Sequence, residues 1–151
     1  MKERRVKETR EFMRRLLTTD LFDAWLLTEA VVAGASTWTV DGRINRAYYE
    51  QDADGREEMP QEDFTRWGEV RPVIFDLIRG KRTPLSFRFL LKPTAELSRD
   101  GICRIRFTEG HVHITSAVTM KEFSTDRGPE HDWDEACSRF LEESEILCEE
   151  L

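Results

Sequence analysis

Hydrophobic and polar residues alternate along the middle of the chain, which is the pattern of half-buried β-strands. The first such strand is predicted over residues 84–92. Its inward-facing side chains are expected to be Leu85, Phe87, Phe89 and Leu91. The alternation resumes over residues 103–107 and 112–115, and Glu109-Gly110 between them predicts a tight turn. The pattern therefore indicates an antiparallel sheet with one face on the core.

Three stretches have the apolar spacing of amphipathic helices instead. They are residues 8–17, residues 61–79 and residues 129–148. Pro72 lies inside the second stretch and predicts either a bend or a new helix starting near Arg71. Gly80 fits the C-terminal cap of that helix.

The N-terminal third is less regular. Residues 3–7 predict a short edge strand before the first helix. Residues 21–33 fit either a helix or a strand that places Trp25, Leu27, Glu29 and Val31 on one side. The β-branched pair Val31-Val32 favours the strand.

A hairpin is predicted next. Residues 36–40 are strand formers, and Asp41-Gly42 favours a type I′ turn with residues 43–49 as the returning strand. Residues 50–63 are rich in Asp and Glu and predict a loop. A last strand is expected over residues 117–123.

These elements together predict a single α+β domain over residues 1–151, with antiparallel hairpins packed against about three helices. An alternative is a duplicated β-α-β-β-β unit. Residues 38–44 and 105–112 would then be equivalent, because each reads as a strand, an acid-glycine turn and a second strand.

The composition limits the partners. The 151 residues carry a formal net charge of -7, which disfavours nucleic acid and anionic membranes. The three cysteines have no metal-ligand spacing and fit a reducing compartment. No segment approaches the length of an apolar membrane span, so we expect a cytoplasmic protein that does not bind membranes.

One cationic cluster stands out in this acidic chain. It consists of Arg71, Arg79, Lys81, Arg82 and Arg88, around the end of the second helix and the strand that follows. Guanidinium groups hold phosphate and carboxylate well, so the cluster is a candidate anion site. The alternative interpretation is a set of solvated or internally paired cations, with Arg79 favoured by the helix dipole.

Other candidate chemistry is sparse. His111 and His113 share one face of a strand and could ligate a metal, although no convincing third ligand is present and exposed polar positions explain them equally well. Glu29 lies among apolar residues and is expected to form an ion pair or to be exposed. No nucleophile, paired-acid or dinucleotide motif is present, so we assign no catalytic residue, metal or cofactor.

Five segments resemble an uncharacterised family of short bacterial proteins, a domain of unknown function. They are residues 21–27 (LFDAWLL), 39–45 (TVDGRIN), 71–72 (RP), 80–87 (GKRTPLSF) and 131–134 (HDWD). The resemblance covers most of the chain and implies a stand-alone, intracellular bacterial domain of the α+β class. That family has no established activity, so the resemblance assigns no functional residues.

Three functions remain open on the sequence. The favoured one is a non-enzymatic binding or regulatory module that contacts another protein through a sheet face or through residues 50–63. The second is binding of an anion or nucleic acid by the cationic cluster. The third is an enzyme with an unrecognised site.

Overall fold

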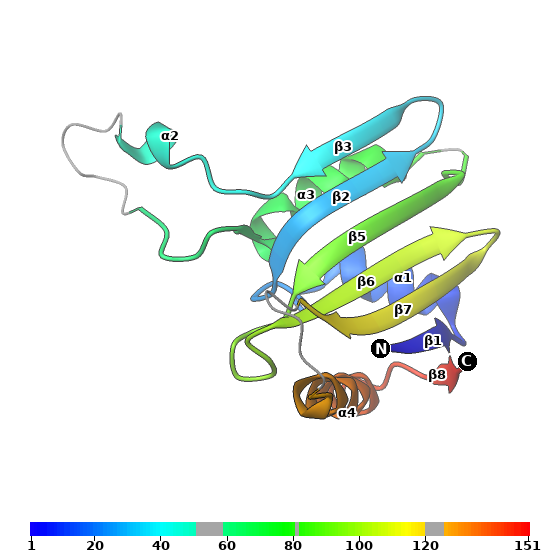
Figure 1. Cartoon of the computed structure of the whole chain (residues 1–151). Coiled ribbons are helices and arrows are strands. Elements are labelled where there is room, and N and C mark those ends of the chain that lie inside the picture. The colour runs from blue at the N-terminus through cyan, green and yellow to red at the C-terminus, as the bar shows by residue number, and fades with distance from the viewer. Residues whose placement is uncertain (51–58, 81, 120–125) are drawn as a thin grey trace.

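The computed structural model describes residues 1–50, 59–80, 82–119 and 126–151 of the chain (Figure 1). These residues form an α+β fold with an eight-stranded antiparallel sheet and four helices. The strands are β1 (Lys2–Val6), β2 (Leu26–Ala33), β3 (Thr37–Asp41), β4 (Thr65–Arg66), β5 (Ser86–Lys92), β6 (Gly101–Thr108), β7 (His111–Val118) and β8 (Cys148–Glu150). The helices are α1 (Thr9–Thr18), α2 (Arg46–Glu50), α3 (Trp67–Ile78) and α4 (Gly128–Glu143).

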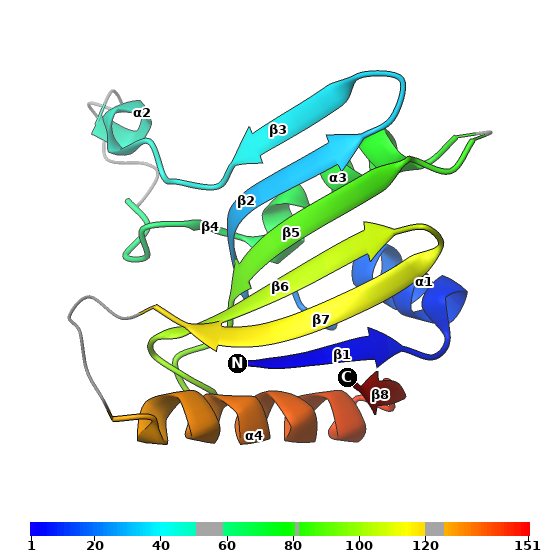
Figure 2. The same cartoon turned by 45° about the vertical axis from the view of Figure 1, so that its right-hand side comes forward.

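The strands lie in the order β3-β2-β5-β6-β7-β1-β8, with the short β4 paired to β2. Residues 3–7 were expected at an edge of the sheet. They are a strand, but β8 pairs with its outer side, so β1 lies one position inside the edge. The N- and C-terminal ends of the described chain are therefore neighbours (Figures 1 and 2).

The three longer helices pack on one face of the sheet. Figures 1 and 2 show α1 and α3 behind the central strands and α4 along the side of β1 and β8. The Trp67 indole on α3 donates a hydrogen bond of 3.1 Å to the Leu16 carbonyl of α1. The Trp133 indole on α4 donates one of 3.0 Å to the Ile102 carbonyl of β6. Because all three helices lie on this side, the opposite face of the sheet carries none of them.

The core lies between these two layers. Phe87, Phe89 and Leu91 are buried as the alternation predicts, whereas Leu85 precedes β5 and is 76% exposed. The prediction that Leu85 faces the core is therefore wrong, because the strand begins one residue after it. Glu109 and Gly110 have φ values of 52° and 80°, which confirms the tight turn between β6 and β7.

Residues 26–33 form a strand, as the Val31-Val32 pair indicated, but their faces differ from the simple alternation. The register between β2 and β5 shifts between Leu27 and Glu29, which is a β-bulge. Beyond it, Ala30 and Val32 are buried and Glu29 and Val31 face away from the core. The predicted common side for Trp25, Leu27, Glu29 and Val31 is therefore wrong.

The predicted type I′ turn at Asp41-Gly42 is also wrong. The hairpin is formed by β2 and β3, and its turn lies at residues 34–36. Gly42 instead passes so close to β2 that an added Cβ would lie 1.8 Å from the Leu27 carbonyl oxygen. Residues 43–49 do not form a returning strand: Arg43 forms an isolated β-bridge, and helix α2 begins at Arg46. The similarity on which the duplicated unit depended is therefore not supported.

The helix and strand limits need three further corrections. Helix α3 starts at Trp67 because residues 65–66 pair with β2, and it continues through Pro72 as one helix. Helix α4 ends at Glu143, since residues 148–150 leave it to form β8. Residues 117–118 belong to β7 and not to a separate strand, and the rest of that predicted strand, residues 120–123, lies outside the described residues.

Candidate functional site

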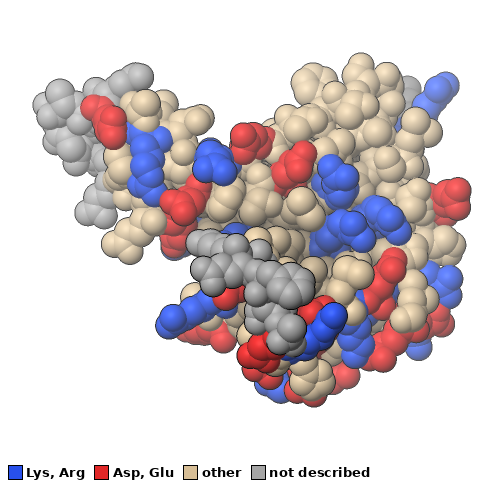
Figure 3. Space-filling view, in the orientation of Figure 1, with Lys and Arg blue, Asp and Glu red and all other residues tan. Residues whose placement is uncertain are grey.

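The open face of the sheet presents a row of nitrogen-rich side chains. Arg88 on β5 lies directly opposite Arg106 on β6, and Arg106 lies directly opposite His113 on β7. Figure 3 shows Lys and Arg side chains gathered over these strands on the helix-free face. Like charges directly opposite each other destabilise a sheet. The arrangement therefore needs negative charge nearby, from the protein or from a partner.

Among the described residues, only loose counter-charges lie near the centre of this row. The Arg88 guanidinium lies 3.9 Å from the Glu29 carboxylate of β2. The Arg106 guanidinium lies 3.7 Å from the Glu3 carboxylate of β1. Both separations exceed the 2.7–2.9 Å or so of a charge-assisted hydrogen bond. The central guanidinium groups consequently keep donors for an external carboxylate.

The outer end of the same row is paired tightly. Arg5 on β1 lies opposite His113 and donates a hydrogen bond of 2.5 Å to Glu149 on β8. This hydrogen bond, together with the positive charge of Arg5, lowers the pKa of the Glu149 carboxyl. The cation near the sheet edge is therefore tightly paired, whereas the cations at the centre have only loose counter-charges among the described residues.

Two nitrogen atoms in the centre have no hydrogen-bond partner among the described residues. They are Nε of Arg106 and Nδ1 of His113, which lie on neighbouring strands. Buried polar atoms are nearly always hydrogen-bonded in folded proteins. Arg104, two residues before Arg106, likewise has neither an ion pair nor a hydrogen bond within the described part of the chain. We define Arg88, Arg104, Arg106 and His113 as the open-face row. Arg5, which is paired with Glu149, is not part of it.

The cationic cluster predicted from the sequence does not converge in the structure. Arg71 donates two hydrogen bonds of 2.9 Å to Asp23, and these bonds raise the pKa of Arg71. Arg79 pairs with Asp76 at 3.0 Å. Arg88 belongs to the open-face row, and Lys81 lies outside the described residues.

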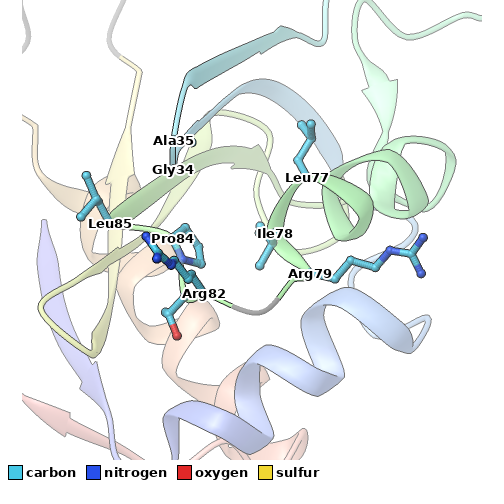
Figure 4. A pocket seen from close by; sticks show the side chains of 9 residues that line it. Gly34, Ala35, Leu77, Ile78, Arg79, Arg82, Pro84 and Leu85 are labelled. Atoms are coloured by element: carbon cyan, nitrogen blue, oxygen red, sulfur yellow. The ribbon is translucent and has the colours of Figure 1, made fainter.

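Arg82, the remaining member of that cluster, lines a cleft of about 410 Å³ with Pro84. In Figure 4 its side chain points over this cleft, whereas the Arg79 side chain points away on the other side. Paired or divergent cations do not form one anion site, so any anion binding by this cluster stays a prediction.

The two histidines share one face of β7, as their spacing predicts. Other potential ligands lie elsewhere: Cys103 is buried on the core face, and His131 is 3.2 Å from Glu135 on α4. Among the described residues, no group of three or more His, Cys, Asp and Glu side chains could hold a metal ion. Glu29 forms the loose ion pair with Arg88 described above, which matches the structural interpretation of that residue.

A buried arginine connects α4 to the sheet on the core side. Arg4 is 2% exposed and donates hydrogen bonds to the Ser138 hydroxyl at 2.9 Å and the Ser116 hydroxyl at 3.2 Å. The thiols of Cys103 and Cys137 lie beside it and hydrogen-bond to each other. That bond and burial raise the pKa of Cys103, while the same bond and the charge of Arg4 lower the pKa of Cys137. The hydrogen bonds of Arg4 therefore join α4 to β1 and β7 on the core side.

Sequence reasoning missed the open-face row because it assigned Arg88 to a different cluster. The sequence did contain a signal for one cross-strand pair of the row, Arg106 with His113. A two-residue turn at Glu109-Gly110 fixes the register of the hairpin, and that register places Arg106 opposite His113. The pairing of Arg88 with Arg106 depends on the longer connection over residues 93–100, which has no such turn rule.

The described residues define a two-layer α+β fold in which the charged face of the sheet carries none of the three longer helices. The chain belongs to a family of unknown function (DUF5721), whose model matches residues 15–149. This confirms the resemblance to a domain of unknown function inferred from the sequence. No curated protein and no solved structure matches the chain. None of the helices in the described ranges is long and apolar enough to cross a membrane.

Proposed function

We propose that this protein is a non-enzymatic binding module and that its partner is a protein that presents an acidic segment to the open face of the sheet. The observation that carries the proposal is the open-face row, in which opposed cations have only loose counter-charges from the part of the chain that the structure describes. Carboxylates of a partner would complete the hydrogen bonds of Arg88, Arg104 and Arg106. The cytoplasmic location expected from the cysteine content is part of this proposal.

The surroundings of the row favour a protein over nucleic acid. Val31 and Leu90 flank the row as half-buried apolar residues, which suits the mixed apolar and polar character of a protein interface. None of the outward positions of β5, β6 and β7 carries a Phe, Tyr or Trp on which bases would stack.

An enzymatic role has less support. Catalytic sites usually place groups with shifted pKa values in a cleft. The described groups with shifted pKa values are the three thiols and the side chains of Glu11, Arg14, Arg71, Glu149 and Glu150. None of them lines either of the two larger described clefts.

The test is a titration of the isotope-labelled protein with a synthetic peptide rich in Asp and Glu. We expect saturable changes in the amide resonances of β5, β6 and β7, weakened by added salt. The double variant Arg88→Glu/Arg106→Glu should lose this binding by at least about tenfold, because charged hydrogen bonds contribute about 1.5–3 kcal/mol each.

The matched control is Arg10→Glu/Arg139→Glu, which changes the net charge equally at exposed positions on α1 and α4. Equal loss of binding in both double variants would mean that the peptide responds only to net charge and would refute the proposal. Tighter binding of a single-stranded oligonucleotide than of the peptide at the same face would favour the nucleic-acid alternative instead.

A further inference from the structure

A second cluster of cations lines a cleft at the end of the sheet, separate from the open-face row. The cleft has a volume of about 480 Å³ and lies where β4, β5 and the connection to β6 meet. Its cations come from three different segments: Arg66 from β4, Lys92 from the end of β5 and Arg99 from the connection. Figure 1 shows this connection as the loop that extends from the lower left of the sheet.

The charge of the cleft is opposite to that of the whole chain. Among the described lining residues, three are cations and one, Glu62, is a carboxylate, whereas the chain has a net charge of -7. Glu62 lies 3.5 Å from the Arg66 guanidinium, which is too far for a tight charge-assisted bond. Arg99 forms no ion pair or hydrogen bond with any described residue. The described lining therefore has a local excess of positive charge, which favours an anionic ligand.

Backbone hydrogen bonds within the connection shape one wall of the cleft. The backbone N–H groups of Leu97 and Ser98 both donate to the Thr94 carbonyl, at 3.0 and 3.1 Å, and fix the turn of the connection. Pro93 at its start is buried. The ammonium group of Lys92 lies 5.9 Å from the centre of the Phe64 ring, a cation–π distance that limits where it can move.

The remaining lining defines the chemistry of the ligand. Thr94 and Ser98 add polar residues to the lining, and Leu26 and Ala95 add apolar ones. The volume falls within the usual range for small-molecule sites and is too small for a folded partner. Forked guanidinium groups together with a lysine match the several oxygens of a dianion.

We propose that this cleft binds a small phosphate monoester, with its phosphate held by Arg66, Lys92 and Arg99 and its body against Leu26 and Ala95. The proposal does not depend on the open-face row, because the two sites share none of these residues. A phosphate group bears close to two negative charges at neutral pH and three acceptor oxygens, which balances the excess charge of the lining.

The experiment measures binding of inorganic phosphate, glycerol 3-phosphate and adenosine monophosphate by calorimetry and by amide resonance changes, at constant ionic strength in chloride. We expect saturable binding, with the largest changes in the connection from residue 93 to residue 100. The variant Arg99→Glu should weaken binding by at least about tenfold. Since Arg99 is exposed, its circular dichroism spectrum and melting temperature should match those of the parent protein.

The control is Arg139→Glu, an exposed charge reversal on α4, which should leave binding unchanged. The proposal is overturned if Arg99→Glu binds as the parent does, if Arg139→Glu weakens binding equally, or if none of the three compounds binds more tightly than chloride. Tighter binding of succinate or of a phosphodiester oligonucleotide would also overturn it. Because Arg99→Glu leaves the open-face row intact, its binding of the acidic peptide separates failure of this site from failure of the proposed function.

Discussion

The guanidinium group of Arg71 on α3 and the carboxylate of Asp23 form a two-point ion pair, with both hydrogen bonds at 2.9 Å. Asp23 lies in the turn before β2, so the pair joins that turn to the helix that covers the strand. The Asp23 side chain also fills the space beside Gly68, where an added Cβ would lie 2.8 Å from it. Arg71, which the sequence placed in the candidate anion site, is therefore already bound to a carboxylate of the protein.

Replacing Arg71 with lysine should therefore destabilise the protein. A lysine cannot make the forked contact, and both partners are partly buried, with side chains 21% and 29% exposed. We expect Arg71→Lys to lower the free energy of unfolding by about 1 kcal/mol in urea denaturation. The control is Arg79→Lys in the exposed pair with Asp76, which should cost less than about 0.5 kcal/mol. Equal costs for the two variants would contradict this role for Asp23.

Gly42 tests the close approach that replaced the predicted hairpin turn. Any side chain at this position would collide with the backbone of Leu27, and backbone cannot move as a flexible side chain can. We expect Gly42→Ala to cost about 3 kcal/mol, measured as the shift in the urea midpoint. Gly34→Ala is the matched control, since its nearest neighbour would be 4.0 Å away. A nearly neutral Gly42→Ala would show that residues 42 and 27 are further apart than described.

Arg4 should be intolerant of lysine although the charge is preserved. Its planar group serves Ser116, Ser138 and the Asp134 carbonyl at once, and a lysine would leave some of these buried groups unpaired. We expect Arg4→Lys to lower the free energy of unfolding by about 2 kcal/mol. Arg5→Lys on the adjacent, outward-facing position should cost far less. Indistinguishable melting temperatures for the two variants would argue against a buried hydrogen-bonded Arg4.

Acid should release the C-terminal strand before it unfolds the domain. Hydrogen bonds from Arg5 and Lys2 lower the pKa of Glu149 and Glu150, respectively. Because these pKa values are lower in the folded state, the pairs stabilise β8 above the ordinary glutamate pKa of about 4.3, and this stabilisation is lost as the pH falls through the folded-state values.

Hydrogen exchange can follow this release. The amides of Lys7 and Leu151 donate across the β1–β8 edge, to Leu147 and Glu3, and report directly on it. We expect their protection factors to fall as the pH drops below about 4.3, while those of β6 remain high. In Glu149→Gln/Glu150→Gln the fall should be absent and protection low throughout. A drop of equal size in β6 would indicate global unfolding instead.

Local patterns in the sequence were enough for the central hairpin. The alternation of Phe87 and Phe89, and of Cys103 and Ile105, depends on a period of two residues that every strand imposes. The turn at Glu109-Gly110 depends on the local backbone angles of these two residues. The amphipathic spacing likewise identified α1, α3 and α4 to within a few residues, apart from the ends described above.

The tertiary structure alone decided the features that long-range pairing sets. The bulge beside Thr28 shifts the faces of β2 only because β5 pairs with it, and Gly42 is confined only because it crosses that bulge. The same pairing brings Arg88 opposite Arg106 across residues far apart in the chain. Periodicity and turn chemistry act over a few residues and are written in the sequence, whereas register between distant strands is fixed by the packing of the whole core, which no local pattern contains.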